Sequence, residues 1–124
     1  MKIAFIDDSP SDRFIFQKYL SGFNIEIDTF KSSIDFGRHE VDETSYDYIF
    51  IDVHVNHGAG SDAIMKGLKD KVTARFVLIS SSKDHLTKDY RDDKRIDRLM
   101  LKWNKARLQD WAKTRLMFEE LEKV

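Results

Sequence analysis

The chain contains no cysteine, which excludes disulfide frameworks, thiolate metal sites and cysteine nucleophiles. It has one proline and no tract rich in proline, glycine or serine, so nothing marks a domain boundary. Charge of one sign is not in excess either, because 35% of the residues are charged but the formal net charge is −1. That balance gives no global field that would favour direct binding of nucleic acid or of an anionic membrane.

Long hydrophobic runs are also missing. The first apolar run, Ile3 to Ile6, is too short for a signal-peptide core or a membrane span and ends at two acids. We therefore expect a cytoplasmic protein without a membrane segment. A length of 124 residues fits one domain of ordinary size, so we expect a single domain over residues 1–124.

Five short apolar segments have the pattern of strands. In the segment Tyr46–Val53, the residues Ile49, Phe50 and Ile51 are apolar without alternation, which is typical of a parallel strand covered by helices on both faces. The other predicted strands are Lys2–Ile6, Asn24–Phe30, Arg75–Ser80 and Ile96–Leu101.

Helical segments alternate with these strands. Ser9 is placed to cap a helix that starts at Pro10, and Asp12 lies where its carboxylate closes a capping box. This helix is predicted to run to about Leu20, with its apolar stripe at Phe14, Ile15, Lys18 and Tyr19. Further helices are predicted over residues 32–43, 62–71, 83–95 and 105–123.

Five alternations of strand and helix predict an α/β fold. By the handedness and crossover rules, this is a five-stranded parallel sheet with helices on both faces, in the flavodoxin-like strand order 2-1-3-4-5. In that order the first and third strands are neighbours. Residues that follow the strands then meet at the carboxyl edge of the sheet, where such folds place their ligands.

Three carboxylates are predicted to converge at this edge, because Asp7 and Asp8 follow the first strand and Asp52 ends the third. Carboxylates this close repel one another and call for a cation. Oxygen ligands in a solvated site favour Mg²⁺. The fourth and fifth strands bring Ser80 and Lys102 to the same edge. Taken alone, Asp52 could equally be a cap for the segment that follows it.

This set of residues suits phosphoryl transfer to a carboxylate. Asp52 lies centrally and is the candidate nucleophile, Lys102 neutralises a phosphoryl oxygen opposite the metal, and Ser80 donates to another oxygen. The product would be an aspartyl phosphate.

The chain resembles the receiver domains of two-component response regulators, of the chemotaxis-regulator type, over nearly its whole length. The residues that carry the resemblance are Asp7, Asp8, Asp52, Gly60, Ser80 and Lys102. The resemblance implies a stand-alone receiver that is not an enzyme but assists its own phosphorylation and dephosphorylation. A sensor histidine kinase or phosphotransfer protein would phosphorylate Asp52, and a downstream protein target would receive the signal.

The resemblance also implies a ligand set for Mg²⁺. Asp8 would bind the ion directly and Asp7 largely through water, with Asp52 and the backbone carbonyl of His54 completing the protein's share. Ser80 and Lys102 would sense the phosphoryl group.

The sequence departs from the family pattern at three positions. Asn56 and Trp103 stand where prolines are usual, and Leu99 replaces an aromatic residue that acts as a switch in many members. For Trp103, either a trans peptide bond or a strained one is considered. These departures put the usual coupling to output in question.

Other interpretations remain open. One is a Mg²⁺-dependent phosphohydrolase that uses Asp52 as its nucleophile, and another is a degenerate receiver that acts as an unphosphorylated scaffold. The rings of His54 and His57 could form a transition-metal site near Asp52, although a histidine there more often points to solvent. The last helix has more apolar surface than one stripe needs, which indicates either a wide core face or a patch for a partner or a homodimer.

Overall fold

A five-stranded parallel sheet forms the centre of the structure. The computed structural model describes residues 1–38, 45–53, 66, 72–82 and 93–122. Its strands are β1 (Lys2–Ile6), β2 (Glu26–Phe30), β3 (Tyr48–Asp52), β4 (Arg75–Ser80) and β5 (Ile96–Leu101). Its helices include α1 (Pro10–Leu20), α2 (Ser33–Arg38) and α5 (Lys105–Glu122).

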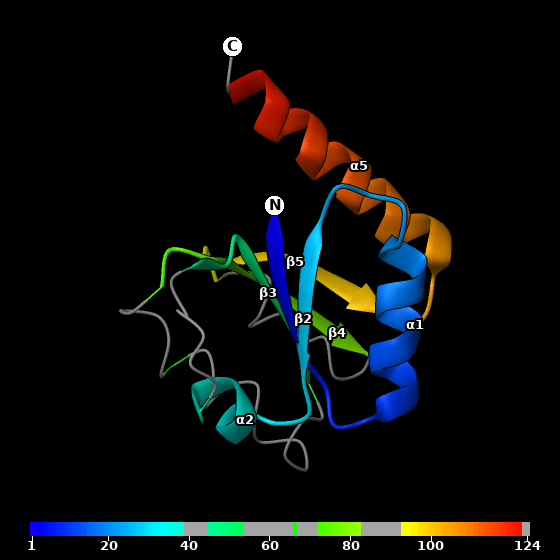
Figure 1. Cartoon of the computed structure of the whole chain (residues 1–124), viewed down its shortest axis with the longest axis vertical. Helices are drawn as coiled ribbons and strands as arrows, with labels where there is room; N and C mark the ends of the chain where they lie inside the picture. Colours follow the sequence, from blue (N-terminus) through cyan, green and yellow to red (C-terminus); the bar gives the residue numbers. More distant parts are fainter. Residues whose placement is uncertain (39–44, 54–65, 67–71, 83–92, 123–124) are drawn as a thin grey trace.

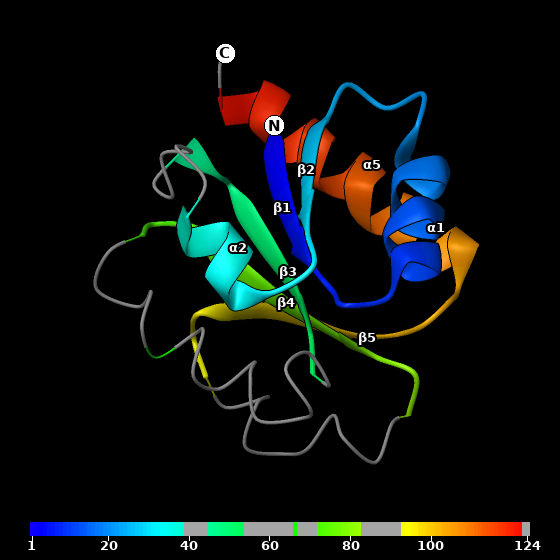
Figure 2. The same cartoon turned by 60° about the horizontal axis from the view of Figure 1, so that its bottom comes forward.

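The strand order is β2-β1-β3-β4-β5, with every neighbouring pair parallel. This confirms the predicted topology. Figures 1 and 2 show α1 and α5 side by side on one face of the sheet and α2 on the other, so helices cover both faces as expected. The far end of α5 extends beyond the sheet, at the same end of the molecule as the N-terminus (Figure 1).

Successive residues of the inner strands pack into two separate hydrophobic cores, because side chains alternate between the faces of a strand. In β1, Ile3 and Phe5 face α1 and α5, whereas Ala4 and Ile6 face α2. The strands β3 and β4 alternate in the same way. Burial on both faces explains why these strands read as continuous apolar runs in the sequence.

Helix α1 packs through a different stripe from the one we expected. Phe16 and Leu20 are buried, while Phe14 is 64% exposed. The Phe16 ring lies 4.3 Å from the Phe5 ring and 4.9 Å from the Phe50 ring, measured between centroids. The expectation of a core stripe that includes Phe14 was therefore wrong. Phe16 is the residue that points inward, because it packs against the aromatic side chains of the sheet.

Helix α5 has two different halves. Leu108, Trp111 and Ala112 are buried against the sheet. Farther along, Met117, Phe118 and Leu121 are between 51% and 63% exposed. The first half of α5 is thus a core face, and the second half carries an exposed apolar patch, so each of the two interpretations of the apolar surface fits one half.

Several predicted features fall outside the described residues. They include most of the helices expected over 62–71 and 83–95, and the positions of His54, Asn56, His57 and Gly60. The helix expected over 32–43 is observed as α2 over Ser33–Arg38, and residues 39–43 also lie outside the described part of the chain. Strand β2 begins at Glu26 rather than Asn24. Among the described helices, none combines the length and apolar character needed to cross a bilayer.

Candidate functional site

The candidate site lies at the carboxyl edge of the sheet, where backbone hydrogen bonds continue just beyond the strand ends. The amide of Asp7 donates to the Phe30 carbonyl, and the amide of Val53 donates to the Ile79 carbonyl, both at 2.9 Å. The amide of Lys102 donates to the Ser80 carbonyl at 2.8 Å. These bonds fix the residues that follow β1, β3 and β5 along one edge, beside the end of β4.

Three carboxylates meet at this edge. Asp7, Asp8 and Asp52 each offer an oxygen that lies within 4.8 Å of the others. Asp7 and Asp52 are buried and Asp8 is exposed, so the cluster opens to solvent on the Asp8 side. The predicted convergence of the residues after the first and third strands is therefore present in the structure.

Lys102 enters the cluster from β5. Its ammonium nitrogen lies 2.6 Å from Asp7 Oδ2, 2.8 Å from Asp12 Oδ2 and 3.6 Å from Asp52 Oδ2. Its side chain is 9% exposed. The ammonium group therefore supplies a fixed positive charge among several carboxylates, with its shortest contacts on the α1 side of the site rather than to Asp52.

The role of Asp12 is one that the sequence analysis missed. The amide of Asp12 donates to Ser9 Oγ at 3.3 Å, as in a capping box. The return bond of the box goes elsewhere, because the Ser9 amide donates to Asp7 Oδ1 at 2.9 Å. The Asp12 carboxylate instead accepts from Lys102 and from Trp103 Nε1, the latter at 2.8 Å. The expected local capping box is thus replaced by a contact between distant segments.

Trp103 stands where a proline is usual in the family that the sequence resembles, and it contributes to this site. The peptide bond between Lys102 and Trp103 is cis. The indole lies at the edge of the core under α1, with its ring centroid 6.1 Å from that of Phe5 and 6.2 Å from those of Phe16 and Tyr19. This packing directs the indole N–H toward Asp12.

The charges of the site shift the pKa values of three groups. Burial raises the pKa of Asp7 above its usual value, and the hydrogen bonds from Lys102 and Ser9 offset only part of that effect. Burial also acts to raise the pKa of Asp12, but hydrogen bonds from Lys102 and Trp103 outweigh it and leave that pKa lowered. For Lys102, burial lowers the pKa, but the bonds to Asp12 and Asp7 prevail and raise it. Lys102 is therefore positively charged at neutral pH.

Ser80 is buried at the end of β4, one residue beyond the partner of Asp52 in the strand register. Its hydroxyl oxygen accepts from the Ser82 amide at 3.1 Å. The register places Ser80 beside the end of β3, and the hydroxyl hydrogen is free to rotate toward a ligand's oxygen.

The donor set fits a magnesium ion. It consists of carboxylate oxygens, which are hard ligands, and one side is open for the waters that Mg²⁺ usually retains. Asp8 is the exposed member. Both oxygens of Asp7 already accept hydrogen bonds, from Ser9 and Lys102. The exposed carboxylate of Asp8 is therefore better placed than that of Asp7 to bind the ion directly.

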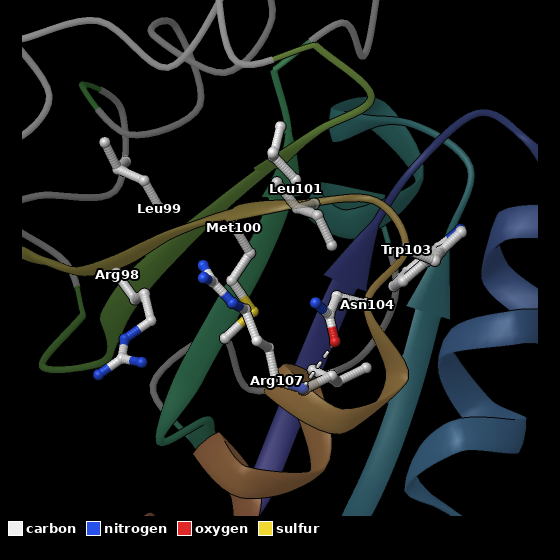
Figure 3. A pocket seen from close by; sticks show the side chains of 9 residues that line it. Arg98, Leu99, Met100, Leu101, Trp103, Asn104 and Arg107 are labelled. Carbon is white, nitrogen blue, oxygen red and sulfur yellow. Dashed lines mark hydrogen bonds between the residues drawn. The ribbon is translucent and has the colours of Figure 1, made fainter.

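A separate pocket of about 240 Å³ lies between β5 and the start of α5. Met100, Asn104 and Arg107 line it, and Trp103 borders it on one side (Figure 3). Leu99 points to the other face of β5, where it packs against the hydrophobic core on the α2 side of the sheet. The position expected to hold an aromatic switch thus contributes an aliphatic side chain to the core.

Comparison with known proteins identifies the fold. No protein-family model matches the sequence, and no curated protein matches it. Three similar solved structures illustrate the likeness. A response regulator receiver domain (CheY-like) from Methylobacillus flagellatus has a TM-score of 0.75 and 22% identity, covering 92% of this chain and 97% of that chain.

A response regulator receiver protein from Pseudoalteromonas atlantica has a TM-score of 0.73 and 18% identity, covering 87% of this chain and 90% of that chain. The signal receiver domain of an HD domain-containing protein from Pseudomonas fluorescens has a TM-score of 0.77 and 14% identity, covering 98% of this chain and 90% of that chain. The expectation of receiver architecture is confirmed: the chain has the fold of a response regulator receiver domain.

Proposed function

We propose that the protein is a stand-alone receiver that accepts a phosphoryl group on Asp52 with the help of Mg²⁺. The observation that carries the proposal is the convergence of Asp7, Asp8 and Asp52 within 4.8 Å, with the Lys102 ammonium 3.6 Å from Asp52. A single acid at a strand end has many explanations. Three acids beside a buried lysine, at the carboxyl edge of a receiver fold, form a set suited to phosphoryl transfer.

In the proposed reaction, a carboxylate oxygen of Asp52 bonds to phosphorus while the bond from phosphorus to the donor breaks. For a phosphohistidine donor, the leaving imidazole nitrogen keeps the bonding electrons. Bound at Asp8 and Asp52, Mg²⁺ would neutralise phosphoryl oxygens. Lys102 offers positive charge on the opposite side, and Ser80 offers a hydroxyl donor.

The donor is proposed to be a sensor histidine kinase or a phosphotransfer protein, and the receiver of the signal a downstream protein. The phosphoryl group would shift the population between two conformations through its contacts with Lys102 and Ser80. The exposed residues Met117, Phe118 and Leu121 of α5 are a surface available for a partner or for a second copy. In this proposal the protein assists its own phosphorylation and dephosphorylation and turns over no external substrate.

The test is incubation with Mg²⁺ and acetyl phosphate, followed by intact-mass spectrometry. We expect one phosphoryl group on the wild type and none on Asp52→Asn. Asp47→Asn is the matched control, because Asp47 precedes the opposite end of β3 and its carboxylate accepts from the Lys2 amide. Asparagine keeps an acceptor there, so phosphorylation should be unchanged.

Two other results would each replace this proposal. Release of inorganic phosphate over many turnovers from a generic phosphate ester, lost in Asp52→Asn, would indicate a phosphohydrolase. No mass increase and no binding of beryllofluoride by the wild type would indicate a scaffold that works without phosphorylation.

A further inference from the structure

Lys102 forms hydrogen bonds with Asp7 and Asp12, and Asp12 belongs to α1. The Lys102 ammonium makes hydrogen bonds of 2.6 Å to Asp7 and 2.8 Å to Asp12, whereas Asp52 Oδ2 lies at 3.6 Å, beyond hydrogen-bond distance. A lysine ammonium has three donors. Two of them serve Asp7 and Asp12 in this structure, and the proposed function needs Lys102 to engage a group on Asp52.

Asp12 is held in place by contacts of its own. It lies in the first turn of α1, where its amide donates to Ser9 Oγ, and the N-terminal end of a helix favours a negative charge. Its second carboxylate oxygen accepts from Trp103 Nε1 at 2.8 Å. The side chain is 23% exposed. Asp12 is thus an anchored, partly buried negative charge.

Trp103 makes this anchor rigid. Its ring packs among Phe5, Phe16 and Tyr19, so the indole N–H has a fixed direction. Trp103 also follows Lys102 directly in the chain. A movement of Lys102 toward Asp52 therefore changes the charge beside the acceptor of the indole N–H, which makes that N–H a natural probe of where Lys102 points.

We propose that Asp12 is a positioning residue that competes with the phosphoryl group on Asp52 for Lys102. The inference rests on the proposed function, because competition has a consequence only if Asp52 carries such a group. A charge-assisted hydrogen bond must be weakened or shared before Lys102 engages the phosphoryl oxygens fully. Asp12 thereby lowers the occupancy of the phosphorylated form at a given donor concentration.

The test is a titration of the Mg²⁺-loaded protein with beryllofluoride, which mimics the phosphoryl group. Asp12→Asn removes the charge but keeps an oxygen for the Trp103 N–H. We expect it to bind beryllofluoride roughly three- to tenfold more tightly than the wild type, as expected for one partly exposed ion pair. Asp12→Ser also removes the charge and provides the same comparison if the asparagine variant does not fold.

A second readout separates positioning from a general effect on stability. The Trp103 indole proton gives an NMR resonance that is assigned by its loss in Trp103→Phe. Beryllofluoride should shift this resonance in the wild type, because Lys102 leaves the carboxylate that accepts the indole N–H. In Asp12→Asn the shift should be smaller, because Lys102 is no longer held by a charge there.

Asp35→Asn is the matched control. Asp35 lies in the first turn of α2, and its amide donates to Ser32 Oγ at 3.1 Å. Asp35 has the same local position as Asp12, in the first turn of a helix, but does not contact Lys102. The Asp35→Asn variant should therefore bind beryllofluoride with the affinity of the wild type. Unchanged or weaker binding by Asp12→Asn, with a wild type that binds, would overturn this inference alone. A wild type that binds no beryllofluoride would overturn the proposed function and this inference with it.

Discussion

Asp97 joins β5 to α5 through charge-assisted hydrogen bonds. Its carboxylate accepts from Trp111 Nε1 at 2.9 Å and from Arg115 Nη2 at 2.8 Å, and its side chain is 5% exposed. Removal of one partner from a buried pair leaves the other without compensation, and that loss exceeds what the pair itself contributes. Asp97 therefore fixes how the buried half of α5 sits on the sheet.

We expect Asp97→Ala to lower the free energy of unfolding by about 3 kcal/mol, because Arg115 and Trp111 lose a buried acceptor. Urea denaturation measures this change. Asp110→Ala is the control, since Asp110 is exposed on the same helix, and its effect should stay within about 0.5 kcal/mol. Equal losses in both variants would show that the Asp97 contacts contribute nothing specific.

The site residues differ in how well the sequence predicts them. Asp7, Asp8, Asp52, Ser80 and Lys102 each follow or end an apolar run, so the edge they share follows from the strand order alone. The contacts of Asp12 do not follow from any local pattern. The capping-box spacing explains its amide, but its carboxylate contacts lie 90 and 91 residues away along the chain, at Lys102 and Trp103.

At the scale of elements, α1 allows a comparison between two phenylalanines of one helix. Phe16 is buried between the Phe5 and Phe50 rings, and Phe14 is 64% exposed. We expect Phe16→Ala to lower the free energy of unfolding by about 3–5 kcal/mol, because it leaves a cavity in the core. Phe14→Ala should cost less than about 0.5 kcal/mol.

Chemical denaturation of both variants measures the difference, and each serves as the other's control. Similar losses would mean that Phe14 also contributes to a buried contact. The stripe of α1 could not be assigned from periodicity, because Phe14, Ile15 and Phe16 are consecutive and offer several apolar faces. Which face of α1 is buried depends on the side chains of the sheet that it contacts, and these belong to segments distant in the sequence.

At the scale of the whole molecule, the topology was the most predictable property. Alternation of strands and helices, together with right-handed crossovers, leaves few arrangements for five parallel strands. The observed order is the predicted one. The two halves of α5 were less predictable, because a sequence shows how much apolar surface a helix has but not where the sheet beneath it ends.

Asp7 links the stability of the whole domain to pH. Burial raises its pKa above the usual value of 3.8. A group with a raised pKa contributes stability that is fully present below its unfolded pKa and is lost as the pH rises through its folded pKa. Without metal, the domain therefore loses this contribution above about pH 4. The lowered pKa of Asp12 has the opposite effect on stability. Its contribution is present above its unfolded pKa and is lost as the pH falls through its folded pKa.

In the proposed magnesium site, Mg²⁺ would favour the charged form of the carboxylates, so a proton on Asp7 and the ion would compete. At about ten times its dissociation constant, Mg²⁺ should stabilise the folded domain by about 1.4 kcal/mol, or raise the Tm by about 5 °C, at about pH 7. The gain should shrink markedly at about pH 4. Thermal melts at constant ionic strength measure it. Asp8→Asn should abolish the gain and Asp47→Asn should keep it, whereas an equal gain in all three proteins would assign it to general screening by salt.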